Sequence, residues 1–411
     1  DDADNNVHSH SHSHSPESSS ALGIIAIRGI PNFVKTKRNL LPLAHKLVHL
    51  PSNYLEEDLA DEASFYSSGY SHGKEKMGDA PDYSKASFYF NPITDVPGTE
   101  EDRIRYPASY PVNKWPDAKR FPGLDLEERG KEMGRLMKDV VVLLAKHVDR
   151  YIMTKCHDYR PILEQEMKQT EKVKGRLLYY FPLEAARNHH HARRETNSNS
   201  DDHDHDEGEG EGEGENCTPV GDTPAEDSWI GWHNDSGFFT ALAGDMYLHH
   251  DTGECIPKDQ VDPDAGLHIM DRRGVVTQVD IPEDCMAVQI GECLQIISGG
   301  KVVATPHCVR GADPLFRNEN DEDRWNEKIS ANVTKRYNVA RISFPCFVDT
   351  IPSFPLKVPA STNRDNVLQS SVDCAKKVPP LEHRWKKDGM DFGSFLHDTF
   401  AMYYEWSCNQ K

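Results

Sequence analysis

Apolar residues recur with helical spacing in three parts of the chain. A short apolar run at residues 22–27 precedes a Gly-Ile-Pro turn and a stripe over residues 40–47, so we expect a strand, a turn and a helix there. A stripe between residues 392 and 404 predicts a C-terminal helix packed on the outside of the core. The longest stripe predicts a long amphipathic helix and consists of Met133, Leu136, Met137, Val140, Val141, Leu144 and Val148.

From about residue 229 onward the pattern changes to short β-rich runs. Residues 274–281, 286–290 and 341–348 are runs of this kind, and Gly, Pro and Asp separate them. Many short strands within one segment favour a sandwich or a jelly roll. Together with the helices, this pattern predicts an α+β fold built around one principal core.

Two tracts have a composition that opposes folding. Residues 1–20 alternate His with Ser, and residues 188–216 combine His, Asp and an EGEGEGEGE run. We interpret the first as a solvated tail and the second as a disordered surface insertion, although loose metal binding by their histidines stays open. They divide the chain into an N-terminal helical and strand region (21–187), a catalytic core (217–350) and a C-terminal extension with a helix (351–411).

Charge and composition narrow the class of protein. The formal net charge of -20 argues against binding to nucleic acid or to an anionic membrane surface, since phosphate contacts need concentrated Lys and Arg. No apolar run approaches the ~18 to 20 residues of a membrane-spanning helix. Nine cysteines without a CxxC pair are unlike a secreted disulfide scaffold, which favours a reducing cytoplasm. Whether a targeting segment has been removed stays open.

The candidate chemistry begins with a His-x-Asp pair. On a strand, residues two apart point to the same side, so His233 and Asp235 can present an imidazole and a carboxylate to one ion. His307 follows a later strand-like segment and is the candidate third ligand. Two histidines and one carboxylate form the facial triad of ferrous oxygenases, which leaves positions open for a cosubstrate and dioxygen.

An Arg-x-Ser pair lies on another apparent strand. Arg341 and Ser343 share a face for the same reason. A guanidinium offers a bidentate grip on a carboxylate, and a hydroxyl adds a hydrogen bond. This pair suits the distal carboxylate of 2-oxoglutarate.

With these motifs, the chain resembles the isopenicillin N synthase-like branch of the 2-oxoglutarate and Fe(II)-dependent oxygenases. The resemblance spans most of the predicted ordered chain and rests on five segments: residues 23–31 (GIIAIRGIP), 233–245 (HNDSGFFTALAGD), 266–269 (GLHI), 290–300 (IGECLQIISGG) and 341–344 (RISF). It implies a double-stranded β-helix, or jelly roll, with packing helices from the N-terminal region and a C-terminal helix. In that fold, residues 266–269 and 290–300 correspond to strands before the distal histidine.

The resemblance also implies an activity. Fe(II) held by the triad and 2-oxoglutarate held by Arg341 and Ser343 would oxidise a small organic substrate, by hydroxylation, desaturation or ring closure, with release of succinate and carbon dioxide. Where relatives place Asn and Tyr beside the cosubstrate, this chain offers Tyr179 and Phe181. Two alternatives stay open: an iron oxygenase that does not use 2-oxoglutarate, and a catalytically silent metal-binding or interaction protein. The substrate and the oligomeric state are not predicted.

Overall fold

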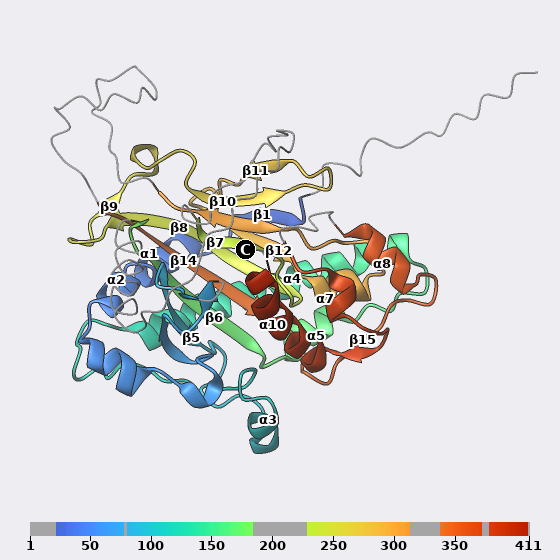
Figure 1. Ribbon diagram of the computed structural model, residues 1–411, viewed down its shortest axis with the longest axis horizontal. Helices are drawn as coiled ribbons and strands as arrows, with labels where there is room; N and C mark the ends of the chain where they lie inside the picture. The colour runs from blue at the N-terminus through green and yellow to red at the C-terminus, as the bar shows by residue number, and fades with distance from the viewer. Residues whose placement is uncertain (1–21, 78–79, 184–227, 313–337, 372–377, 410–411) are drawn as a thin grey trace, which may run out of the picture.

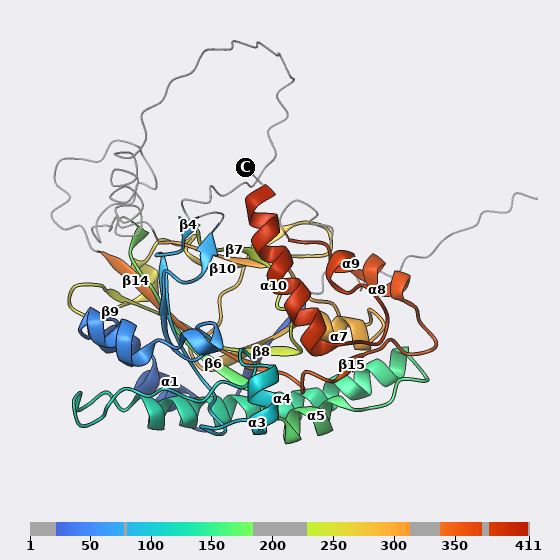
Figure 2. The same ribbon diagram turned by 60° about the horizontal axis from the view of Figure 1, so that its bottom comes forward.

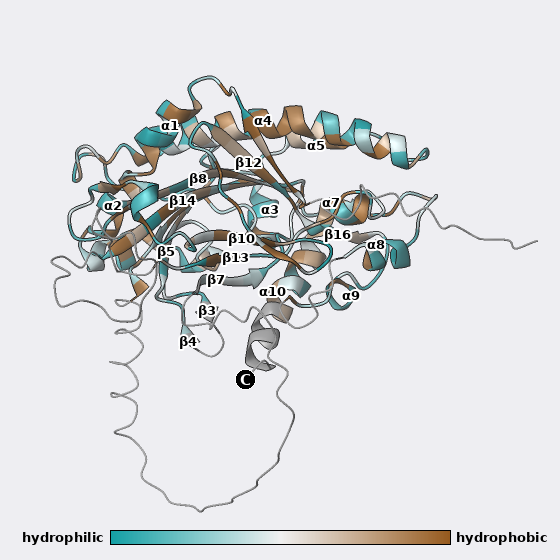
Figure 3. Cartoon of the chain, turned by 90° about the horizontal axis from the view of Figure 1, so that it is seen from above, coloured by the Kyte–Doolittle hydropathy of each residue, from teal (hydrophilic) through white to brown (hydrophobic). Residues whose placement is uncertain are grey.

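Two antiparallel β-sheets and a set of covering helices make up the described part of the chain. The computed structural model describes residues 22–77, 80–183, 228–312, 338–371 and 378–409 (Figure 1). The predicted tail (1–20) and acidic insertion (188–216) lie outside these residues. The two sheets form separate layers, with β8, β12 and β14 in one and β7, β10 and β13 in the other (Figure 3).

The larger sheet has eight strands drawn from both halves of the chain. Its strand order runs β1 (Ile24–Arg28), β12 (Cys285–Ile290), β8 (Phe239–His249), β14 (Val339–Val348), β6 (Val173–Tyr180), β5 (Lys85–Phe90) and β2 (Gly69–His72), with β9 (Cys255–Ile256) paired to β8. Strands that precede residue 187 therefore lie in the same sheet as strands of the predicted core. One face of this sheet packs on helices, and the other faces the smaller sheet.

The smaller sheet supplies the second layer. Its order is β11 (Val276–Gln278), β10 (Gly266–Met270), β13 (His307–Arg310) and β7 (Ser228–His233). Two further pairs are short: β3 (Lys76–Met77) with β4 (Ala80–Pro81), and β15 (Pro355–Leu356) with β16 (Met390–Asp391). Buried apolar side chains from both layers, among them Leu178, Tyr247, Leu267 and Val309, pack in one cluster between the sheets.

Helices cover the outer face of the larger sheet and the ends of both layers. The α-helices are α1 (Phe33–Leu40), α2 (Leu43–Val48), α3 (Glu100–Arg105), α4 (Leu126–Lys155), α5 (Leu163–Gln169), α7 (Glu292–Ile297), α8 (Arg364–Ser370), α9 (Leu381–Arg384) and α10 (Phe392–Asn409). Figure 2 shows α4 running along the face of the larger sheet. Its acidic first turn (Glu127, Glu128) and basic last residue (Lys155) complement the helix dipole.

The structure confirms the predicted long helix, the N-terminal strand and the C-terminal helix. The single helix expected over residues 40–47 is instead two helices, α1 and α2, and Pro42 is the N-cap of the second. Another expectation was wrong: residues 292–297, expected within a strand, form helix α7. All six of its residues are buried, and a short helix that is buried on every side has no periodicity to separate it from a buried strand. No helix within the described residues is long and apolar enough to cross a membrane.

Candidate metal centre and its cavity

The smaller sheet brings the three predicted metal ligands together. His233 ends β7, Asp235 follows two residues later, and His307 begins β13 directly opposite His233 in the strand register. One ligand atom from each of the three residues lies within 4.8 Å of the others. The His307 Nε2 atom is 3.9 Å from the Asp235 Oδ1 atom, and the two imidazole centroids are 4.2 Å apart. Asp235 thus reaches the cluster from the loop after β7, and not from the strand itself.

Hydrogen bonds fix how the two imidazoles are protonated. The Nδ1 atom of His233 is 2.9 Å from the carbonyl oxygen of Gly231, and that of His307 is 3.1 Å from the carbonyl oxygen of Thr305. A carbonyl only accepts, so each Nδ1 donates a proton to it, which directs the Nε2 atom toward the cluster as the possible metal ligand. Burial, and then the neighbouring His307, lower the pKa of His233 to about 4, so its imidazole is neutral at physiological pH.

The third candidate ligand has an oxygen atom without a partner. The Oδ2 atom of Asp235 is buried and makes no hydrogen bond in the described part of the molecule. A buried carboxylate oxygen is costly unless something compensates it. Two imidazole nitrogens and this carboxylate form a donor set that suits a divalent transition metal. The residues therefore fit the ferrous ion that the sequence predicts.

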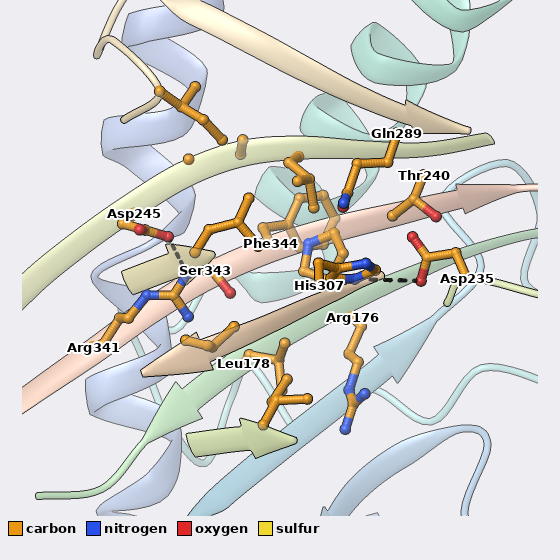
Figure 4. A pocket seen from close by; sticks show the side chains of 18 of the residues that line it. Arg176, Leu178, Asp235, Thr240, Asp245, Gln289, His307, Arg341, Ser343 and Phe344 are labelled. Atoms are coloured by element: carbon orange, nitrogen blue, oxygen red, sulfur yellow. Dashed lines mark hydrogen bonds and ion pairs between the residues drawn. The ribbon is translucent and has the colours of Figure 1, made fainter. Parts of the chain in front are cut away.

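The cluster opens into a cavity between the two sheets. The cavity encloses about 600 Å³ of empty space, including its opening to solvent. Its walls are mostly apolar, with Leu178, Leu242, Leu267 and Phe344 among them. The polar side chains that line it besides the triad are Arg176, Tyr180, Thr240, Asp245, Gln289, Arg341 and Ser343. Figure 4 shows Arg341 and Asp245 on one side of His307, and Thr240 next to Asp235 on the other side.

Arg341 and Ser343 both line this cavity, and they lie two residues apart on β14. The Arg341 guanidinium forms an ion pair with Asp245 through Nη2 and stacks on the Tyr180 ring, with its Cζ atom 4.7 Å from the ring centroid. Its Nε and Nη1 atoms are buried and have no hydrogen-bond partner among the described residues. A buried arginine with two unsatisfied donor nitrogens beside a serine hydroxyl has the chemistry needed to bind an acidic oxygen.

Tyr179 and Phe181 do not line the cavity. Successive residues of β6 point to opposite sides, and Tyr179 lies on the other side, where its hydroxyl is 2.8 Å from the Nδ1 atom of His250. Leu178 and Tyr180 occupy the cavity side instead. The sequence left open whether Tyr179 and Phe181 contact a cosubstrate, and the structure places neither of them in the wall of this cavity.

Sequence reasoning also missed other polar residues of the cavity. Asp245 belongs to the quoted HNDSGFFTALAGD motif, but only strand pairing places it beside Arg341. Gln289 lies on β12 opposite Thr240 of β8, and its Nε2 atom is buried without a partner in the described part of the chain. The register between neighbouring strands brings these residues together. The apolar and polar pattern of a single strand does not predict that register.

The fold is similar to solved structures at low sequence identity. A full-length protein of Neurospora crassa in complex with alpha-KG matches with a TM-score of 0.53 and 16% identity, over 92% of this chain and 86% of that chain. The same fungal protein in complex with alpha-KG and thymine matches with a TM-score of 0.53 and 15% identity, over 93% and 88% of the two chains. No protein-family model and no curated protein matches the chain. At these identities, the similarity establishes a shared fold.

Proposed function

We propose that this protein is an Fe(II)- and 2-oxoglutarate-dependent dioxygenase that oxidises a small organic substrate within a jelly-roll core. One observation carries the proposal. A single cavity contains both a two-histidine, one-carboxylate cluster and a buried arginine with two unsatisfied N–H groups beside a serine. The first feature suits a ferrous ion with open positions, and the second suits a carboxylate at a distance from that ion.

In this proposal, His233, Asp235 and His307 hold the iron through two Nε2 atoms and a carboxylate oxygen. Iron with 2-oxoglutarate and dioxygen supplies the oxidising chemistry, with release of succinate and carbon dioxide. Arg341 and Ser343 bind the distal carboxylate of 2-oxoglutarate and thereby orient its keto acid end toward the triad. The apolar walls exclude bulk water, which strengthens these charged contacts.

The shared fold supports this proposal. Alpha-KG, bound in both structures of the Neurospora crassa protein, is another name for 2-oxoglutarate. The free thiols of six described cysteines, Cys156, Cys255, Cys285, Cys293, Cys308 and Cys346, fit the reducing cytoplasm that we propose as its location. We propose dioxygen and a small molecule as its partners, and neither nucleic acid nor a membrane.

Anaerobic titration of the apo protein with Fe(II) and then 2-oxoglutarate tests the function. We expect one iron per chain and a weak visible charge-transfer band when 2-oxoglutarate chelates it. Alanine variants of His233, Asp235 and His307 should each lose the tight iron site, whereas Arg341→Met should keep iron and weaken 2-oxoglutarate at least tenfold. Unchanged iron stoichiometry in all three alanine variants would refute the ligand assignment.

One observation favours a second candidate, an iron oxygenase that does not use 2-oxoglutarate. Arg341 already has a carboxylate partner in Asp245, so its charge is balanced without a cosubstrate. The same titration separates the two candidates. Iron binding without a 2-oxoglutarate band would favour the second, and iron binding with no oxygen consumption across many substrates would favour a catalytically silent protein.

A further inference from the structure

Basic residues continue along the cavity face of β6 beyond the triad. Alternate residues of this strand face the space between the sheets, where Leu178 and Tyr180 lie near Arg341. The preceding residues on the same face are Arg176 and Lys174, both only partly buried. Both cationic groups lie over the ring of Tyr89, with Lys174 Nζ 5.8 Å and Arg176 Cζ 5.0 Å from its centroid. Arg176 itself lines the cavity.

Strand register connects Lys174 to the cavity wall. Lys174 lies opposite Phe347 on β14, Phe347 lies opposite Thr240 on β8, and Thr240 lies opposite Gln289 on β12. Residues directly opposite in antiparallel strands point to the same face. Phe347, Thr240 and Gln289 line the cavity, and Lys174 continues their row just beyond the residues that form its wall.

This row lies on the opposite side of the triad from the Arg341 site. Thr240 lies beside Asp235, and Arg341 lies on the far side of His307 (Figure 4). Along β14 the two ends are separated by the four residues from Ser343 to Phe347, or about 13 Å at ~3.3 Å per residue. The cavity thus has two separate basic ends with the triad between them.

The carboxylates near the second basic end form ion pairs with neighbouring cations. Glu75 accepts a 2.5 Å hydrogen bond from Arg176 and also lies 3.2 Å from Lys85. Lys85 has a second partner in Asp82. Lys172, just before β6, is 3.1 Å from Asp349. Each of these three cations therefore has a carboxylate partner.

Lys174 is the exception. Its ammonium group donates a 2.9 Å hydrogen bond to the carbonyl oxygen of Ala108 and forms no ion pair within the described residues. Of the four cations of this end, Lys172, Arg176 and Lys85 form ion pairs with carboxylates, and Lys174 is left without one. Burial, and then the nearby Lys172, lower the pKa of Lys174 to about 7. An anion at this position would restore the ordinary charge of the lysine.

We infer that the substrate of this cavity is a small organic monocarboxylic acid whose carboxylate binds Lys174 beside Arg176. A single cation without a carboxylate partner matches a ligand with one negative charge better than it matches a phosphate dianion. Phe347, Pro345 and the Tyr89 ring provide the apolar contacts for the rest of the molecule. This inference rests on the proposed function, since it places the substrate on the side of the triad away from the cosubstrate.

The experiment measures binding of neutral and acidic probes to the full-length protein. Protein loaded anaerobically with Fe(II) and saturating 2-oxoglutarate is titrated calorimetrically with acetate, butanoate, benzoate, phenylacetate and 3-phenylpropanoate, each paired with its primary amide. We expect at least one acid to bind tenfold or more tightly than its amide. That preference should disappear in Lys174→Met, return in Lys174→Arg, and persist in the control Lys35→Met, which changes an exposed lysine of α1.

Each result has a definite meaning. If none of the five acids binds better than its amide, or if the preference survives in Lys174→Met, the inference is overturned. A preference that disappears in Arg341→Met but survives in Lys174→Met would place the acids in the cosubstrate site and also overturn it. The visible band of the iron and 2-oxoglutarate chelate is recorded in the same samples, so failure of the proposed function shows separately as absence of that band.

Discussion

At the scale of single residues, the arginine of the cavity depends on one carboxylate. Asp245 pairs with Arg341, and its charge also acts on the buried ammonium of Lys37 from α1. Burial lowers the pKa of Lys37, and Asp245 opposes that effect. Removing one partner of a buried ion pair leaves an uncompensated charge, which typically costs about 3–5 kcal/mol. Asp245 therefore holds the guanidinium in place before any cosubstrate arrives.

Asp245→Asn should lower the melting temperature by several degrees, because it leaves Arg341 without its carboxylate partner and removes one of the two carboxylates that act on Lys37. Added 2-oxoglutarate should raise the melting temperature of the variant more than that of the wild type, since the ligand then supplies the missing negative charge. Thermal unfolding with and without 2-oxoglutarate measures both effects. The control is Asp264→Asn, which affects an exposed pair with Arg310 whose N–O distance is 4.0 Å.

Two results would contradict this account of Asp245. An Asp245→Asn variant as stable as the wild type would mean that Arg341 finds another partner. A smaller 2-oxoglutarate increment than in the wild type would mean that Asp245 orients the guanidinium for binding and does not merely balance its charge.

The sequence contains the candidate site residues, but strand pairing determines which of them meet. His233, Asp235 and His307 were predicted from residue type and spacing, and their ligand atoms do lie together. Tyr180 and Gln289 were not predicted. Their position depends on the register of β6 and β12 with neighbouring strands, and a bulge between Ser343 and Pro345 shifts that register within β14.

At the scale of elements, the long helix α4 approaches the larger sheet through two glycines. A Cβ atom on Gly134 would lie 2.3 Å from the Cβ atom of Pro92, and one on Gly130 would lie 2.7 Å from Phe90. Glycine in a helix interior costs about 1 kcal/mol relative to alanine. The close contact with the residues at and after the end of β5 therefore compensates for an intrinsic weakness of the helix.

Gly134→Ala should reduce the free energy of unfolding by up to about 2 kcal/mol. Alanine adds roughly 1 kcal/mol of helix propensity, but overpacking against the rigid Pro92 ring costs about 1–3 kcal/mol and moves α4 from the sheet. Urea unfolding measures the difference, with the exposed Arg135→Ala on the same helix as the control. A Gly134→Ala protein more stable than the wild type would show that α4 can shift without loss of packing.

Elements with a clear period were predictable, and buried ones without a period were not. The apolar stripe from Met133 to Val148 predicted the central part of α4 because one face of that helix is buried and the other is exposed to solvent. Helix α7 is buried on every side, so its sequence carries no alternation of apolar and polar positions. The pairing of N-terminal strands with β14 and β12 in one sheet likewise depends on contacts far apart in the chain.

At the scale of the whole molecule, buried charge couples the fold to pH. Burial alone would raise the pKa of Glu75, but Arg176, Lys85 and the Tyr89 hydroxyl outweigh it and hold that pKa at about 2. A carboxyl group with a depressed pKa in the folded state stabilises the fold fully above its unfolded pKa of 4.5. That contribution is lost as the pH falls from 4.5 toward 2, where the folded protein also takes up the proton.

Glu75→Gln should therefore destabilise the protein at pH 7 and much less at pH 3. The amide keeps the size of the side chain but leaves Arg176 without a charged partner at any pH, whereas the wild-type protein loses that pairing only in acid. Unfolding free energies of both proteins from pH 7 to pH 3 test this, with the exposed Glu132→Gln as the control. A difference between wild type and Glu75→Gln that stays constant over this range would mean that Glu75 acts through hydrogen bonds alone. The carboxylate of Glu75 would then not balance the charge of Arg176 beside Lys174.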